Sequence, residues 1–280
     1  MSRTELIVHR QAGALGAEVR GVDLAAGLTE RLVSDLRALW LAHGVLFFRG
    51  QDALTPQGLA ALARRFGEPV EYPFLKGLSE APEVIVVAKL EQERVNFGGV
   101  WHTDTAYLEA PPMGTMLLAR ETPPYGGDTL FASGEAAFAA LSLGMQELLT
   151  GLRAVNSSSK ADVTKTREDR LRDAGRAGEG PVFEAVHPVV RTHPETGRRS
   201  LYVNFAHTTR FDGMTEAESV GLLAYLFDHQ TRPEFTCRFS WRPGSLAWWD
   251  NRCCLHNPVN DYHGHRRVMH RVSLAGDAPR

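Results

Sequence analysis

Short apolar runs and alternating apolar and polar positions recur along most of the chain. These patterns, bounded by Gly, Pro or polar clusters, predict β-strands. The predicted strands lie within 5–10, 44–51, 84–90, 113–121, 128–133, 235–242, 245–251 and 267–276, and two more surround a turn in 187–204. Apolar residues at helical spacing predict helices within 28–44, 55–68, 133–152 and 214–232. The last of these opens with a capping box at Thr215 and Glu218.

Strands outnumber helices in this pattern and do not alternate with them as a doubly wound sheet requires. We therefore expect a mainly β fold with flanking helices, built on a double-stranded β-helix (jelly roll) core whose mouth holds ligands. No internal repeat or linker is visible, so residues 1–280 are predicted to form a single domain. The charged, Gly-dotted segment 157–181 is predicted to be a mobile loop, and could serve as a lid over a site.

The amino-acid composition argues against several classes of function. A formal net charge of −2 argues against a dedicated nucleic-acid or anionic-membrane surface, and no apolar run is long enough to cross a bilayer. The three cysteines and the absence of a signal-like apolar stretch near the N-terminus lead us to expect a cytoplasmic protein.

The segment WHTD, residues 101–104, carries the first candidate chemistry. On an extended strand His102 and Asp104 would project from the same face, because residues i and i+2 share a side. An imidazole and a carboxylate pointing together form a large part of a metal site.

Among eleven histidines, His256 is the best candidate for a third ligand. It follows the predicted strand at 245–251 and precedes an Asn-Pro pair at which the chain must bend. Two histidines and one carboxylate on one face of an octahedron are typical of non-heme Fe(II) oxygenases, although zinc uses the same ligands.

The strand predicted at 267–276 places Arg267, Met269 and Arg271 on one face. Two guanidinium groups directed into a cavity require bound anions, because an unpaired buried charge is costly. The alternative, two surface arginines paired with acids, stays open on spacing alone.

These residues occur within a larger set of motifs. WHTD (101–104), PPYGGDTLFAS (123–133), the segment 186–204, WWDNRCCLH (248–256) and RRVMHRVSL (266–274) resemble the taurine dioxygenase (TauD/TfdA) family. The resemblance spans nearly the whole chain. It implies a jelly-roll enzyme that uses Fe(II), 2-oxoglutarate and O₂, and that hydroxylates its substrate with release of succinate and CO₂.

The resemblance also implies roles for individual residues. His102, Asp104 and His256 would bind iron. Arg267 and Thr129 would bind the distal carboxylate of 2-oxoglutarate, and Arg271 the anionic group of the substrate.

The substrate is less well defined. Tyr72, His207 and Asn96 occupy positions where this chain departs from the taurine enzyme, and they are predicted substrate contacts. Sulfonates such as taurine, alkyl sulfates and aryloxyalkanoates all remain candidates for the small anionic substrate. A homo-oligomer, dimer or tetramer, is expected from the resemblance. A zinc-dependent hydrolase and a non-catalytic anion-binding jelly roll remain the alternatives.

Overall fold

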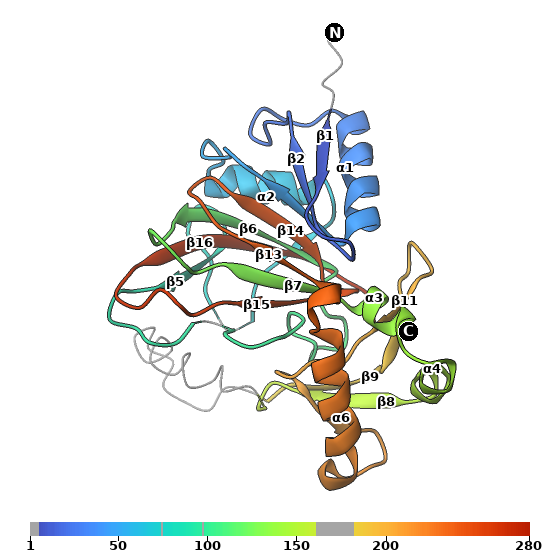
Figure 1. Cartoon of the computed structure of the whole chain (residues 1–280). Helices are drawn as coiled ribbons and strands as arrows, with labels where there is room; N and C mark the ends of the chain where they lie inside the picture. The colour runs from blue at the N-terminus through green and yellow to red at the C-terminus, as the bar shows by residue number, and fades with distance from the viewer. Residues whose placement is uncertain (1–5, 74, 97, 161–181) are drawn as a thin grey trace.

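The core of the molecule is a large mixed sheet, in the computed structural model that describes residues 6–73, 75–96, 98–160 and 182–280. Its strands follow the order β1-β2-β3-β14-β6-β16-β4, and β5 pairs with β16 (Figure 1). Their bounds are β1 Ile7–Arg10, β2 Ala17–Arg20, β3 Val45–Phe48, β4 Pro69–Val70, β5 Ile85–Lys89, β6 Gly114–Glu121, β14 Leu246–Asp250 and β16 Arg267–Leu274. All pairs are antiparallel except β2 with β3.

A smaller sheet packs against the large one. It contains β13 Thr236–Phe239, β7 Thr129–Ser133 and β15 Cys254–Pro258, in that order. Side chains from both sheets form one buried cluster that includes Phe47, Phe131, Phe239, Trp249 and Met269. Two facing, mainly antiparallel sheets around this core confirm the predicted mainly β jelly roll.

Two helices cover the outer face of the large sheet, α1 Glu30–His43 and α2 Pro56–Arg64 (Figure 1). Trp40 of α1 stacks on Trp248 of β14 with ring centroids 4.4 Å apart. Covering this face explains why β3 reads as a continuous apolar run: Val45 and Phe47 face the inner cluster, while Leu46 and Phe48 face the helices. Both helices lie within the ranges predicted from the sequence, and the hydroxyls of Thr29 and Thr55 cap their first turns.

A third region packs beside the two sheets. It contains α3 Gly134–Ala139, α4 Leu143–Thr150, α6 Glu216–Gln230 and the short 3₁₀ helix η1 Pro233–Phe235. Its strands are β8 Arg153–Ser157, β9 Glu184–Pro188, β10 Val190–Thr192, β11 Arg199–Leu201 and β12 Thr208–Phe211. The single helix predicted within 133–152 is two helices, because Ser142 caps a new helix by accepting a hydrogen bond from the Met145 amide. The predicted capping box of α6 is confirmed.

The sequence pattern missed several strands, chiefly β2, β8, β12 and β15. Of these, β15 carries His256. Of the predicted mobile segment 157–181, residues 161–181 lie outside the described residues, so that prediction and the single-domain prediction stay untested.

Candidate active site

His102 and His256 are held together by the backbone. The amide of each donates to the carbonyl of the other, at 3.0 and 2.8 Å, and their ring centroids are 4.1 Å apart. This isolated bridge is the only paired position in 101–104; Asp104 lies in a turn, and the following Thr105 has a φ of 43°. The strand assumed for WHTD is therefore wrong beyond His102, yet the turn still directs Asp104 toward the two imidazoles.

The three predicted ligand side chains converge. Oδ1 of Asp104 lies 3.7 Å from Nε2 of His102 and 3.7 Å from Nε2 of His256. One ligand atom from each residue falls within 4.8 Å of the other two, and all three residues are buried. Two imidazole nitrogens and one carboxylate oxygen at this spacing can face one divalent cation.

Both imidazoles are prepared to act as ligands. Nδ1 of His102 lies 2.7 Å from the Val100 carbonyl, which fixes it as the protonated nitrogen and leaves the Nε2 lone pair directed toward Asp104. Burial, together with the neighbouring His102, holds the pKa of His256 well below its usual range. His256 is therefore neutral at neutral pH, the form that binds metal.

A directed chain of hydrogen bonds orients Asp104. Trp249 Nε1 donates to Asn251 Oδ1 at 2.9 Å, and Asn251 Nδ2 donates to Thr115 Oγ1 at 3.0 Å. Thr115 Oγ1 then donates to Asp104 Oδ2 at 2.7 Å. This chain occupies one carboxylate oxygen and leaves Oδ1 facing the imidazoles.

Arg271 contacts the same carboxylate. Its Nη2 lies 2.8 Å from Asp104 Oδ1. Burial opposes ionisation of Asp104, but Arg271, the two imidazoles and the Thr115 hydroxyl outweigh it and hold the pKa of Asp104 below its usual range. A cation bound between the three ligands would compete with Arg271 for Oδ1.

Around Arg271 lies a narrow cavity lined by Tyr72, Gly98, Tyr107 and His207 as well as His102 and Asp104. Arg271 packs on the Tyr72 ring, with its guanidinium carbon 5.3 Å from the centroid. The ring of His207 meets that of Tyr107 edge to face at 4.8 Å. Two of the three predicted substrate contacts, Tyr72 and His207, thus lie beside the metal-ligand cluster.

Asn96, the third predicted substrate contact, lies elsewhere. Its Nδ2 donates to the carbonyls of Pro258 and Val259, and its Oδ1 accepts from the Tyr262 hydroxyl. It lines a second cavity, with Lys89 and Arg267, where its amide holds the wall in place.

Arg267 is buried in that second cavity. Its Nε and Nη2 have no hydrogen-bond partner among the described residues. Its guanidinium carbon lies 5.5 Å from the Trp241 ring centroid, and Trp241 Nε1 donates to Thr129 Oγ1 at 2.9 Å. Trp241 thus lies between the two residues predicted to bind the 2-oxoglutarate carboxylate.

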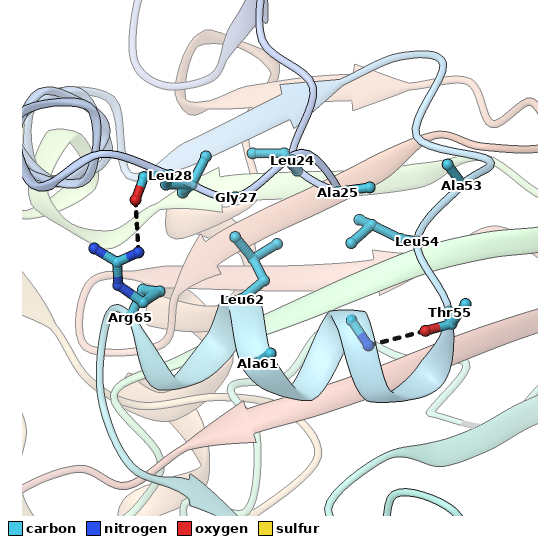
Figure 2. Close-up of a pocket in the computed structure, with 11 residues that line it drawn as sticks. Leu24, Ala25, Gly27, Leu28, Ala53, Leu54, Thr55, Ala61, Leu62 and Arg65 are labelled. Atoms are coloured by element: carbon cyan, nitrogen blue, oxygen red, sulfur yellow. Dashed lines mark hydrogen bonds between the residues drawn. The ribbon is translucent and has the colours of Figure 1, made fainter.

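Two further features could be mistaken for sites. A second buried His/Asp/Cys group, His193, Asp250 and Cys253, also has metal-like spacing. An apolar cavity of about 280 Å³ lies between α2 and residues 24–28 and 53–55 (Figure 2). Arg65 lines this cavity but donates to the Leu28 carbonyl and pairs with Glu30, so no reactive group is directed into it.

The chain matches the model of the taurine catabolism dioxygenase TauD, TfdA family over residues 8–273. It belongs to this family. It is 37% identical to an alpha-ketoglutarate-dependent sulfate ester dioxygenase of Pseudomonas putida, over 98% of this chain and 91% of that protein. It is 34% identical to the alpha-ketoglutarate-dependent 2,4-dichlorophenoxyacetate dioxygenase of Cupriavidus pinatubonensis, over 94% and 95% of the two chains. The crystal structure of a taurine dioxygenase from Burkholderia xenovorans superposes with a TM-score of 0.82 at 36% identity, covering 98% of this chain and 92% of the other.

The sequence pattern missed four residues of the site region: Lys89, Tyr107, Thr115 and Asn251. Thr115 and Lys89 lie on predicted strands, but only the sheet register brings them to Asp104 and Arg267. Asn251 was part of the WWDNR motif without an assigned role. Across the described part of the chain, no helix has the length and apolar character needed to span a membrane.

Proposed function

We propose that this protein is an Fe(II)- and 2-oxoglutarate-dependent dioxygenase that oxidises a small organic anion, with sulfate esters as the leading class. One observation carries the proposal: a buried His102–Asp104–His256 cluster contacts the buried Arg271, and a second buried arginine, Arg267, lies four residues earlier on the same strand. Sulfate esters lead because the P. putida relative is named for that activity, and an Acinetobacter baylyi relative, 33% identical over 98% of this chain, is named an alkylsulfatase.

The ligand residues fit Fe(II). Two imidazoles and one carboxylate, held on one side by their own hydrogen bonds, match the donor set that leaves three positions of an octahedral ion open. His102 and His256 would each offer Nε2, and Asp104 would offer Oδ1. Bound Fe(II), with 2-oxoglutarate and O₂, supplies the oxidising power that removes hydrogen from a substrate C–H bond.

The protein's own groups position the reactants. Arg267, with the Thr129 hydroxyl nearby, binds the distal carboxylate of 2-oxoglutarate, which satisfies guanidinium nitrogens that no described residue pairs. Arg271 binds the substrate anion once Asp104 Oδ1 is engaged by the cation. Tyr72 and His207 line the same cavity and limit the size of the substrate.

A substrate panel tests the proposal. Anaerobic protein is loaded with Fe(II) and 2-oxoglutarate, O₂ is added with one alkyl sulfate, sulfonate or aryloxyalkanoate at a time, and succinate is followed. We expect alkyl sulfates to stimulate succinate formation most strongly. Stimulation by another of the three classes would replace the leading substrate and keep the enzyme class. Tight zinc retention with hydrolysis in the absence of O₂ would contradict the dioxygenase proposal. The oligomeric state, expected to be a dimer or tetramer, remains a prediction.

A further inference from the structure

The cavity around Arg267 contains a second buried cation that the ligand assignments above leave without a role. Lys89 is the last residue of β5 and pairs directly with Arg267 across the sheet. Both side chains line the same cavity, together with Asn96, Pro258 and Tyr262. Like charges on directly opposed residues of neighbouring strands are destabilising, so this pair needs an explanation.

Neither cation is neutralised by hydrogen bonding within the described chain. Lys89 is 3% exposed and its Nζ has no hydrogen-bond partner among the described residues, as is also true of Nε and Nη2 of Arg267. The Lys89 ammonium instead lies 4.2 Å from the Tyr262 ring centroid. A cation–π contact offsets only part of the cost of burying a charge.

The two carboxylates whose charges act on this pair, Glu93 on Lys89 and Asp128 on Arg267, also accept hydrogen bonds from other groups. Asp128 Oδ2 accepts from Arg238 at 2.6 Å, and Glu93 Oε2 accepts from the Leu90 amide at 2.6 Å. Burial lowers the pKa of Lys89 and of Arg267, and the favourable influence of these acids does not cancel that effect. The cavity is therefore electropositive and suited to an external anion.

The position of the cavity matches one end of 2-oxoglutarate. Pro258 lines the cavity and lies two residues after His256 on β15, about 7 Å along the strand at the usual rise per residue. That separation suits a five-carbon diacid with one end at the metal and the other between the cations. Pro258 also pairs with Thr129 on β7.

We propose that Lys89 binds the distal carboxylate of 2-oxoglutarate beside Arg267, and that it makes this enzyme select a dicarboxylic 2-oxo acid over a monocarboxylic one. The proposal rests on the function proposed above. Arg267 and Lys89 would each engage one oxygen of the carboxylate, which gives both buried cations an anionic hydrogen-bond partner and reduces their combined charge from +2 to +1. Lys89 is then a specificity-determining residue for the co-substrate and not for the oxidised substrate.

A binding experiment with two co-substrates tests this role. Fe(II)-loaded, anaerobic wild-type and Lys89→Met proteins are titrated with 2-oxoglutarate and with 2-oxopentanoate, which keeps five carbons and lacks the distal carboxylate. Binding is followed by the visible absorption band of the chelate. Lys89→Met should raise the Kd for 2-oxoglutarate about 10- to 100-fold, the range for loss of a hydrogen bond to a charged group. The Kd for 2-oxopentanoate should not change.

Each alternative result has a distinct meaning. Lys76 is exposed, and Lys76→Met should leave both Kd values unchanged. Equal weakening of both acids in Lys89→Met, or an unchanged preference for 2-oxoglutarate, would overturn the role of Lys89 and leave the proposed function standing. A wild-type protein that forms no band, or that binds both acids equally, would contradict the proposed function itself. Matching thermal denaturation of the two variants and the wild type confirms that folding is intact.

Discussion

Among the residues that the structure describes, two buried clusters have metal-like spacing, and they differ in how far neighbouring protein groups already bond to their nitrogen and oxygen atoms. In the His193 cluster, Nδ1 of His193 accepts from two backbone amides and Nε2 lies 3.0 Å from Asp250 Oδ2. Both oxygens of Asp250 accept from Arg252, and the pKa of Asp250 is lowered to about 2: burial opposes this, but the bonds from Arg252 and His193 outweigh it. This cluster is closed by protein groups.

The His102 cluster is open. Nε2 of each histidine faces Asp104 Oδ1 at 3.7 Å, longer than a hydrogen bond, while the outer atoms His102 Nδ1 and Asp104 Oδ2 are fixed by Val100 and Thr115. Spacing alone therefore does not identify a metal site. What distinguishes the two clusters is that both histidine Nε2 atoms of the first lie beyond hydrogen-bond distance of Asp104 Oδ1, whereas His193 Nε2 lies within hydrogen-bond distance of Asp250 Oδ2.

The largest expected effect on activity is the difference between replacing a histidine of the open cluster and replacing one of the closed cluster. His102→Ala should reduce 2-oxoglutarate-dependent succinate formation to background, because it removes a proposed ligand. His193→Ala should retain turnover per folded molecule. Succinate assays at equal concentrations of folded protein measure both. Full activity in His102→Ala would show that the open cluster is not the catalytic centre.

The closed cluster should matter for stability. Asp250→Asn removes one of the two carboxylates that pair with the buried Arg252 guanidinium, Glu195 being the other, and should lower the free energy of unfolding by about 3–5 kcal/mol. Urea denaturation measures this change. Asp212→Asn, at an exposed position, is the matched control and should change it by less than about 0.5 kcal/mol. Equal effects at both positions would mean that the buried network contributes little.

A smaller effect is expected from the hydrogen bonds that orient Asp104. Thr115→Val removes the hydroxyl but keeps the side-chain shape, and should weaken Fe(II) binding about 10- to 100-fold, as is usual for groups that orient a ligand. The hydroxyl of Thr209 donates to the Val155 carbonyl, and Thr209 lies far along the sequence from the proposed ligands. Thr209→Val should therefore leave Fe(II) affinity unchanged. Unchanged affinity in Thr115→Val would show that the turn backbone alone orients Asp104.

The smallest effect is a pH dependence. Because the pKa of Asp250 in the folded protein, about 2, lies below the ordinary aspartate value of 3.8, its stabilisation is fully present above pH 3.8. It is lost as the pH falls toward 2. The stability difference between wild type and Asp250→Asn should therefore be constant near neutral pH and shrink as the pH falls below about 4. A difference that grows on acidification would contradict the assigned pairing.

The order of apolar and polar residues along the chain predicted those features that neighbouring residues in the sequence determine. Alternation on β16 placed Arg267, Met269 and Arg271 on one buried face, and the structure confirms that all three are buried. The position of His256 between a predicted strand and an Asn-Pro pair, together with the motif resemblance, identified it as a ligand although its own strand, β15, was not predicted. The same order could not predict contacts between strands that are distant in the sequence. Examples are the bridge between His102 and His256 and the register that places Lys89 opposite Arg267. Asn96 illustrates the limit: its place in the chain before WHTD indicated substrate contact, but its amide is fixed in the other cavity.

The most direct test of the comparison is the iron stoichiometry of three proteins under anaerobic equilibrium dialysis with Fe(II). Wild type and Cys253→Ala should each bind one iron per chain, and His256→Ala should bind none while remaining folded. Iron retained by His256→Ala, or lost from folded Cys253→Ala, would contradict the claim that the open cluster alone of the two holds the metal.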